Sequence, residues 1–204
     1  SMRGSKTIKE RIFLLKNCGN IIFNSQWSKK RFLDNIQSRF YNAEKLIIIY
    51  QSSAKQKINF SAKKKWITFV GKLNKAKGYD IFGKAILKIL NKYNTWKAYV
   101  IGDERRESME FKHKNLKLLG FQNHNNVLSI FKKTSIAVAC SRWDEPLGRT
   151  SLEASSNGCA VIISNKGGLP ETITNGIILK KLNENELFNE IDFLIKNFNI
   201  RKKY

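Results

Sequence analysis

The sequence predicts an α/β fold in which a parallel, Rossmann-like sheet is covered by helices on both of its faces. From Trp66 onward, short apolar segments that suit strands alternate with segments of helical periodicity. The connections are short, and several of them begin with glycine directly after an apolar segment. Because this alternation is typical of parallel strands joined by helices, we expect ligands to bind at the loops that follow the strands.

The first 50 residues predict a smaller strand-helix-strand unit with a basic helix before it. The segment Ser25 to Ser28 supplies a cap for the second helix, whose apolar side chains recur at helical spacing. In chain order, the helix, strand, helix and strand are expected at residues 7–17, 20–24, 28–41 and 45–50. Residues 51–65 are polar, rich in lysine and without a clear period, so they predict a linker.

Strands and helices alternate through the rest of the chain, residues 66–204. The expected strands are short apolar runs, and they cover residues 66–70, 96–101, 116–119, 135–139, 159–163 and 176–179. The expected helices cover residues 77–91, 104–112, 123–133, a short stretch from about 148, and 184–197. The helix expected at 104–112 is charged and exposed, whereas those at 77–91 and 123–133 carry apolar side chains on one face.

The charge of the chain is strongly positive, with a formal value of +22. Residues 1–78 contain 18 Lys and Arg against 3 Asp and Glu, a net +15, and the remainder contains 20 against 13, a net +7. Such a field attracts nucleotide diphosphates, anionic lipid headgroups or nucleic acid. Apolar residues at 42% and charged residues at 26% describe a globular chain with one substantial core.

The cysteines and histidines do not predict a disulfide framework or a metal site. The three cysteines, Cys18, Cys140 and Cys159, are odd in number and lack CxxC spacing, which indicates reduced thiols and a cytoplasmic protein. Cys140 and Cys159 lie in apolar segments and are expected in the core. His113 and His124 lie far from other ligand types, so no metal is expected. No apolar run reaches the roughly 18 residues of a membrane span, and no secretory signal pattern is found.

Residues 141–171, SRWDEPLGRTSLEASSNGCAVIISNKGGLPE, form the segment on which the functional prediction depends. Pro146 disfavours helix at Glu145, which is therefore expected on a loop, and Gly148 lets a ligand approach the backbone. The first helical turn that follows has free N–H groups and a positive dipole end, which suit an anion. Glu153, about one turn further along, could reach a ribose. Taken alone, the same residues could be a solvated helix start with ordinary surface acids.

The arrangement resembles the E-x7-E motif of glycosyltransferase family four, the group-1 transferases of GT-B fold. EPLGRTSLEA is similar to EPFG-x-T-x-LEA of that family, and NGCAVIISNKGGLPETI is similar to its following strand and GG-x-x-E loop. The resemblance spans about Trp66 to Asn197. Leu147 stands where Phe is usual and Ala160 where Pro is usual; both remain apolar, so we expect retuned packing with the site retained.

The loop after the first strand of this region carries a second resemblance. GKLNKAKG, residues 71–78, resembles the family pattern G-R-L-x-x-x-KG, in which Arg and Lys grip the donor diphosphate. Lys72 and Lys77 stand at those two positions, and Lys72 offers a point charge instead of the bidentate Arg fork. On composition alone, the two lysines are solvated residues of a lysine-rich chain.

The resemblance also implies roles for other residues around the expected crevice. Gly102 and Phe121 would flank the base, Gly167 and Gly168 would close the site, and Glu171 has either a structural or a binding role. The implied catalytic residues are Lys72, Lys77 and Glu145. The implied nucleotide-sugar-binding residues are Gly71, Lys72, Lys77, Gly102, Phe121, Glu145, Leu147, Gly148, Arg149, Thr150 and Glu153.

The predicted organisation is a remnant of an acceptor-side domain at 1–50, a linker at 51–65 and a donor-binding domain at 66–204. A locally added βαβ extension is the alternative for the first part. The implied function is a retaining glycosyltransferase without metal or cofactor, which takes a nucleotide-diphosphate sugar and a surface-glycan or lipid-linked acceptor. Its peripheral contact with an anionic membrane and its need for a separate acceptor domain stay open.

Two other classes of function compete with this one. The chain could be a pure nucleotide-sugar-binding module, or its charge could serve nucleic acid. No RNA- or DNA-binding motif is present, so no nucleic-acid partner is expected. The base, the sugar and the acceptor are not identified by the sequence.

Overall fold

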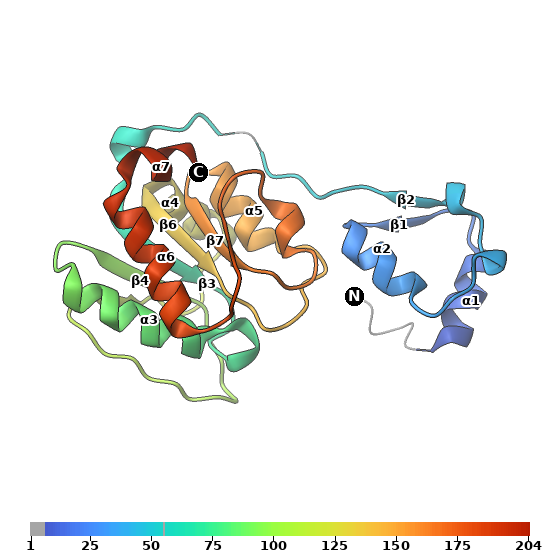
Figure 1. Ribbon diagram of the computed structural model, residues 1–204, viewed down its shortest axis with the longest axis horizontal. Coiled ribbons are helices and arrows are strands. Elements are labelled where there is room, and N and C mark those ends of the chain that lie inside the picture. Colours follow the sequence, from blue (N-terminus) through green and yellow to red (C-terminus); the bar gives the residue numbers. More distant parts are fainter. Residues whose placement is uncertain (1–6, 55) are drawn as a thin grey trace. The chain divides into compact units, whose positions relative to one another are not determined.

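The computed structural model describes residues 7–54 and 56–204, which divide into one compact unit up to Ser52 and a second from Ser53 (Figure 1). The first unit contains a parallel pair of strands with Ile21 opposite Leu46. Its helices and strands are α1 (Ile8–Asn17), β1 (Ile21–Phe23), α2 (Gln26–Leu33) and β2 (Leu46–Ile48). Its buried core consists of Leu15, Phe23, Phe32 and Leu46. The predicted strand-helix-strand order is therefore present; the identity of this unit as part of an acceptor domain stays a prediction.

Helix α2 is shorter than the predicted helix at 28–41. It begins at Gln26, because Ser25 caps it through a reciprocal hydrogen-bond pair with Ser28. It ends at Leu33, two residues before Asn35, whose φ of +61° is left-handed and cannot continue the helix. The Arg11 guanidinium donates to the Phe32 carbonyl at 2.6 Å, which satisfies an acceptor freed at that end. Between Asn35 and β2 the chain forms two short 3₁₀ turns, Ser38–Phe40 and Ala43–Lys45.

The second unit contains a six-stranded sheet in the order β5-β4-β3-β6-β7-β8, and every pair in it is parallel. The strands are β3 (Lys64–Val70), β4 (Lys97–Ile101), β5 (Leu116–Leu118), β6 (Thr134–Ala139), β7 (Ala160–Ser164) and β8 (Ile177–Leu179). All six were expected from the sequence. The chain builds outward from β3 to β5, then returns to the other side of β3 with β6. The order of strands therefore reverses between β3 and β6, where parallel sheets bind ligands.

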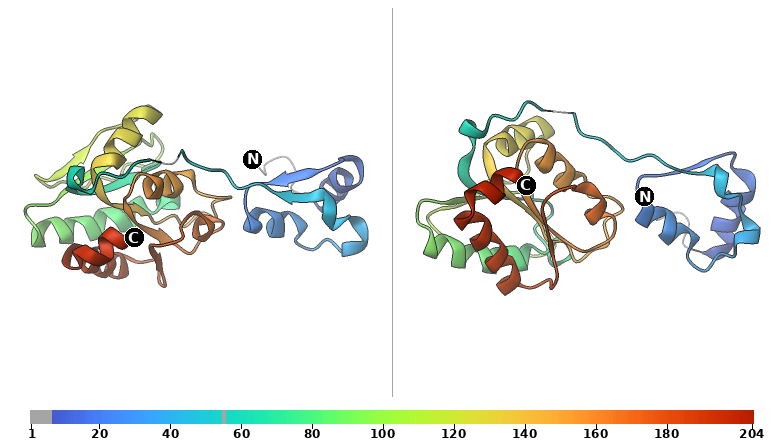
Figure 2. Two further views of the ribbon diagram at one scale, coloured as in Figure 1. Left: turned by 90° about the horizontal axis from the view of Figure 1, so that it is seen from above. Right: turned by 45° about the horizontal axis from the view of Figure 1, so that its top comes forward.

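Helices cover both faces of this sheet, as predicted (Figures 1 and 2). One face packs against α3 (Tyr79–Lys92), α6 (Glu184–Lys196) and α7 (Phe198–Lys203), and the other against α4 (His124–Lys133) and α5 (Arg149–Ser156). Alternate residues of one strand face opposite layers: Ile162 belongs to the first core and Val161 to the second. Helix α7 was not expected from the sequence. Cys140 and Cys159 are buried as predicted, and burial raises the pKa of each thiol to about 12.

The helix predicted at 104–112 is wrong, because that segment is an irregular loop between β4 and β5. Its conformation is set by contacts that helical periodicity does not describe. The Phe111 ring packs edge-on against Tyr79, with centroids 5.4 Å apart, and it fills the space over Gly83 of α3. Glu104 accepts hydrogen bonds from the backbone and guanidinium of Arg106, which together lower the pKa of its carboxyl to about 2. The packing of Phe111 and the hydrogen bonds of Glu104 thus override the local helical pattern.

Part of the predicted linker is built into the second unit. Lys64 and Lys65 already belong to β3, and Ser53 accepts a hydrogen bond from Ser156 of α5 at 2.8 Å. The Lys63 ammonium donates to the carbonyls of three residues that lie far along the chain: Phe131 at 3.0 Å, Thr134 at 2.9 Å and Asn157 at 2.6 Å. Burial lowers the pKa of Lys63, while the nearby Cys159 thiol opposes that shift. The lysine therefore ties the entry of β3 to both the α4–β6 and α5–β7 connections.

We predict that Lys63→Met destabilises the chain by about 2–3 kcal/mol, since three buried carbonyls lose a charged donor and stay dry. The measurement is the free energy of unfolding in urea. The matched control is Lys57→Met, an exposed lysine of the same segment. A loss for Lys63→Met no larger than that of the control would show that the ammonium does not hold this junction.

Candidate functional site

The loops that leave β3 and β6 are fastened to one another at the carboxyl ends of these strands. The Ala76 carbonyl accepts from the Ser141 hydroxyl at 3.1 Å and from the Trp143 amide at 3.0 Å. The Arg142 guanidinium donates to the Lys75 carbonyl at 2.7 Å and to both carboxylate oxygens of Asp80, at 2.5 and 2.7 Å. Residues 71–78 and 141–143 therefore form one continuous wall at the point where the strand order reverses.

Asp80 and Arg142 were not singled out from the sequence, although they join the two predicted loops. Burial would raise the pKa of Asp80, but the hydrogen bonds and charge of Arg142 outweigh it and hold the carboxyl below its ordinary pKa. The bidentate geometry is the strong form of a carboxylate–guanidinium pair. The sequence carried only their opposite charges as a signal, 62 positions apart.

The structure brings Lys77 and Glu145 together and leaves Lys72 apart from them. The Lys77 ammonium forms an ion pair with Oε1 of Glu145, and the two side chains are 33% and 15% exposed. The Lys77 amide is fixed by the Asn74 side chain at 3.0 Å, so this lysine sits on a defined turn. Lys72 is exposed, and within the described part of the chain its side chain has no hydrogen bond or ion pair. The predicted lysine pair is thus one anchored and one free cation.

The Gly-Gly loop, which contains Gly167 and Gly168, packs against the turn that carries Glu145 and holds it in place. The Gly168 amide donates to the Glu145 carbonyl at 2.6 Å. Gly167 has a left-handed φ of +60°, and a Cβ there would overlap the Glu145 carbonyl. Leu147, the departure from the family pattern, is 3% exposed and serves as the apolar anchor of the turn. Gly167 and Gly168 therefore position the acidic turn by close backbone contact.

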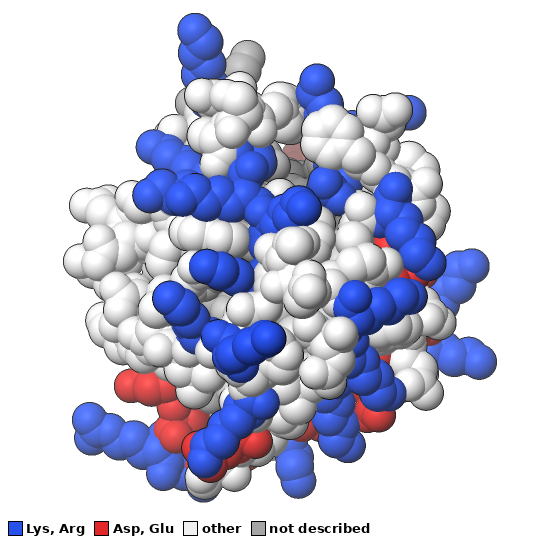
Figure 3. Space-filling model, turned by 90° about the vertical axis from the view of Figure 1, so that its left-hand side faces the viewer, with Lys and Arg blue, Asp and Glu red and all other residues white. Residues whose placement is uncertain are grey.

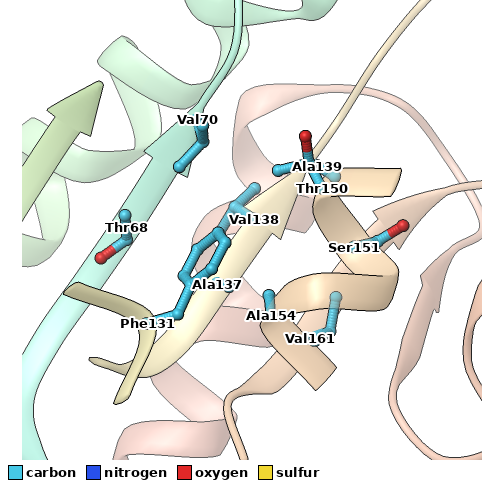
Figure 4. Close-up of a pocket in the computed structure, with 10 residues that line it drawn as sticks. All are labelled: Thr68, Val70, Phe131, Ala137, Val138, Ala139, Thr150, Ser151, Ala154 and Val161. Atoms are coloured by element: carbon cyan, nitrogen blue, oxygen red, sulfur yellow. The ribbon is translucent and has the colours of Figure 1, made fainter. Parts of the chain in front are cut away.

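Helix α5 begins directly after this turn, with Gly148 at its N-cap. Among the described residues no side chain caps the helix, and the N–H groups of its first turn have no partner within it. The Ser151 hydroxyl is 2.7 Å from that of Thr172, which secures the helix to the segment after the Gly-Gly loop. Figure 4 shows Thr150 beside Ala139, which lies at the end of β6; Val70 lies at the end of the neighbouring strand β3. The free helix tip thus faces the reversal point of the sheet.

Figure 4 also shows a narrow crevice between α5 and the sheet. Its lining is mostly apolar and continues the core, so it is a packing space beneath the helix. The polar groups of the candidate site lie outside this crevice, at the N-terminus of α5. Among the residues that the structure describes, no group of three His, Cys, Asp or Glu side chains could hold a metal ion.

The predicted base residues lie on the loops that follow β4 and β5, and the predicted ribose residue lies on α5. Gly102 donates to the Gly120 carbonyl at 2.9 Å, and its Cα passes so close to the Gly71 carbonyl that no Cβ fits. Phe121, which follows Gly120 in the chain, is 76% exposed. Glu153 on α5 is only 13% exposed and is paired with Arg149 and with His124, a contact that the sequence did not predict. The ligand contacts of these residues stay predictions.

Comparison with known proteins bears on this arrangement. Residues 51–204 match the family model described as glycosyl transferases group 1. An uncharacterized glycosyltransferase of Methanocaldococcus jannaschii, MJ1607, is 30% identical over 74% of this chain. The lipopolysaccharide core biosynthesis mannosyltransferase LpsB of Rhizobium meliloti is 25% identical over 62% of the chain. The chain spans 42% and 38% of the lengths of these relatives.

The same fold is found in a solved structure. Anabaena Alr3699/HepE, crystallised in complex with UDP and glucose, superimposes with a TM-score of 0.76 at 19% identity, over 95% of this chain and 58% of that one. The predicted fold class, an α/β fold with a parallel sheet and helices on both faces as in GT-B glycosyltransferases, is therefore confirmed. Together with the family match, it shows that the chain belongs to the group 1 glycosyl transferases.

We predict that Gly167→Ala destabilises the chain more than Gly120→Ala. The two glycines have nearly equal φ values, +60° and +64°, so both substitutions incur the same left-handed strain of about 1 kcal/mol. Only at Gly167 does the new methyl group meet backbone, that of Glu145, whereas nothing lies within 4 Å at Gly120. The difference expected in urea unfolding is at least about 1 kcal/mol. Equal losses would mean that the Gly-Gly loop does not brace the turn.

Proposed function

We propose that this chain is the donor-binding part of a family-four glycosyltransferase that transfers a sugar with retention of configuration and without a metal or cofactor. The observation that carries the proposal is the meeting of three features at one point of the sheet: the uncapped tip of α5, the Glu145 turn and the Lys77 ammonium. A diphosphate at that point receives backbone N–H groups, a helix dipole and a lysine. The donor sugar then lies beside Glu145.

The attraction between Lys77 and a diphosphate depends on whether water is excluded from the site by another domain. A pair of unit charges at 4 Å is worth about 1 kcal/mol in water and about 4 kcal/mol at an effective dielectric near 20. Transfer leaves negative charge on the departing nucleotide diphosphate. Lys77 and Lys72 stabilise that charge most when water is excluded, which in this proposal is achieved by an acceptor domain closing over the donor domain.

The nucleotide and the acceptor are proposed from relatives. HepE was crystallised with UDP and glucose, and we take UDP-sugars as the first donors to test. LpsB is named for mannosyl transfer in lipopolysaccharide core biosynthesis, which favours a surface-glycan acceptor and makes GDP-sugars the second choice. We place the base against Phe121 and Gly102, and the ribose at Glu153.

A second candidate is a binding module that holds the donor but needs a separately supplied acceptor domain. Both candidates require donor binding, so they differ only in turnover. An assay of sugar transfer by the chain alone, and then with an added acceptor domain, separates them.

The basic surface leads us to propose an anionic membrane that carries a lipid-linked acceptor as a further partner. Figure 3 shows a face on which Lys and Arg are spread widely and Asp and Glu are few. No helix in the described ranges is long and apolar enough to cross a membrane. Cytoplasmic location with peripheral contact stays a prediction; flotation with acidic liposomes tests the contact. Binding of random oligonucleotides more tightly than of nucleotide sugars would instead favour nucleic acid.

We expect thermal-shift screening against UDP-, GDP- and ADP-sugars to reveal stabilisation by at least one series, since a ligand that binds only the folded state raises its stability. Glu153→Ala should weaken the affinity for that nucleotide about tenfold, because the ribose loses a charged hydrogen-bond acceptor. Titration calorimetry measures the change. No shift with any nucleotide would contradict donor binding, and unchanged affinity in the variant would contradict the ribose assignment.

We predict that Lys77→Met lowers the affinity for UDP about tenfold and leaves the affinity for uridine unchanged, because only the diphosphate meets the ammonium. Lys117→Met is the matched control, an exposed lysine of β5. Competition titrations of both ligands give the ratio. If Lys77→Met affects uridine and UDP equally, or if the control behaves like it, the phosphate role of Lys77 is refuted.

A further inference from the structure

Glu153 is held through one of its two carboxylate oxygens. Oε1 accepts from Nη2 of Arg149 at 3.0 Å and lies 3.1 Å from Nε2 of His124. For Oε2, residues 7–54 and 56–204 supply no hydrogen-bond partner. The side chain is 13% exposed, so the carboxylate is mostly enclosed while one oxygen keeps its capacity to accept.

The two groups on Oε1 differ in how firmly they can fix it. Arg149 lies one turn earlier on the same helix, and its side chain is 64% exposed. An exposed pair of this spacing fixes little by itself. His124, whose side chain is 56% exposed, differs from Arg149 in coming from another helix, α4, of which it is the first residue. A contact between two elements fixes the carboxylate relative to the loop before α4 as well as relative to α5.

The position of His124 is itself determined by hydrogen bonds within that loop. The Asn123 side chain caps α4 by accepting from the Asn126 amide at 2.9 Å. The Asn126 side chain donates to Gln122 at 3.1 Å, and the Gln122 side chain donates to the Leu119 carbonyl, just beyond β5, at 2.7 Å. The exposed Phe121 lies within the same loop. The segment from Phe121 to His124 thus presents an aromatic ring and a histidine on the side where the nucleotide is proposed to bind.

We propose that His124 is a positioning residue for ribose recognition: it holds Oε1 of Glu153 so that Oε2 accepts from a ribose hydroxyl of the bound nucleotide. The inference rests on the proposed donor binding and adds a residue to it. A glutamate has several rotatable bonds, and fixing it before the ligand arrives removes part of the entropy cost of binding. The Phe121–His124 segment then couples base and ribose recognition.

The test compares ribose discrimination in wild type, His124→Ala and His124→Gln. The probes are UDP, 2′-deoxy-UDP and 3′-deoxy-UDP, or the same set in the guanine or adenine series if the wild type binds that base. The discrimination ratio is the Kd of the weaker-binding deoxy nucleotide divided by the Kd of the parent nucleotide. Urea unfolding of each variant reports on stability separately. His113→Ala, at the only other histidine of the sequence, is the matched control.

We expect His124→Ala to lower the discrimination ratio about threefold to tenfold, the factor that one lost hydrogen bond of positioning corresponds to. His124→Gln, which keeps an N–H donor, should restore most of the ratio, and the control should leave it unchanged. A merely structural contact between α4 and α5 would change stability and weaken all three nucleotides alike; an unchanged ratio therefore overturns the proposal. Absence of binding by wild type to any nucleotide overturns the proposed function and this inference together.

Discussion

The reversal of strand order between β3 and β6 is the constraint on which the rest of this structure depends. Two loops leave the sheet there in opposite directions, and the backbone of one accepts hydrogen bonds from the other at Ala76. Parallel strands deliver their carboxyl ends to one edge, so every loop that carries a candidate side chain arrives at this same edge. Without this reversal, the loop that carries Lys77 and the loop that carries Glu145 would not lie side by side.

Backbone contact, more than side-chain packing, gives the site its shape. The Gly-Gly loop touches the carbonyl of Glu145, and Gly102 touches that of Gly71. Such contacts leave little freedom for the acidic turn or for the start of α5. Three positive groups lie on this rigid backbone: the anchored Lys77, the exposed Lys72 and the uncapped N-terminus of α5. Pre-organised donors of this kind stabilise developing charge without having to reorganise when it appears.

Most of the sheet could be predicted from the sequence, because each strand is a short apolar run bounded by glycine or polar residues. The failures have a common cause in contacts between distant parts of the chain. The charged pattern of residues 104–112 suits an exposed helix, but the packing of Phe111 on α3 decides otherwise. Lys63 looks like one more linker lysine, although its ammonium serves three carbonyls that lie 68 or more positions away.

The candidate site shows the same division. The EPLG turn, Lys77 and Glu153 could be found because their local pattern resembles a known motif. His124 and the Asp80–Arg142 pair could not, since their partners lie 29 and 62 positions away and no local pattern marks them. The sequence predicted only that the loop with Gly167 closes the site. The structure shows that Gly167 lies against the backbone of the turn that carries Glu145.

The central claim is that a diphosphate binds at the tip of α5, beside Lys77. An assigned ¹⁵N–¹H spectrum of the chain titrated with UDP tests it most directly. The account predicts that the largest shifts occur at the amides of Gly148, Arg149 and Thr150, with smaller ones along residues 71–78. Saturable shifts confined to other parts of the molecule, with these amides unmoved, would contradict it.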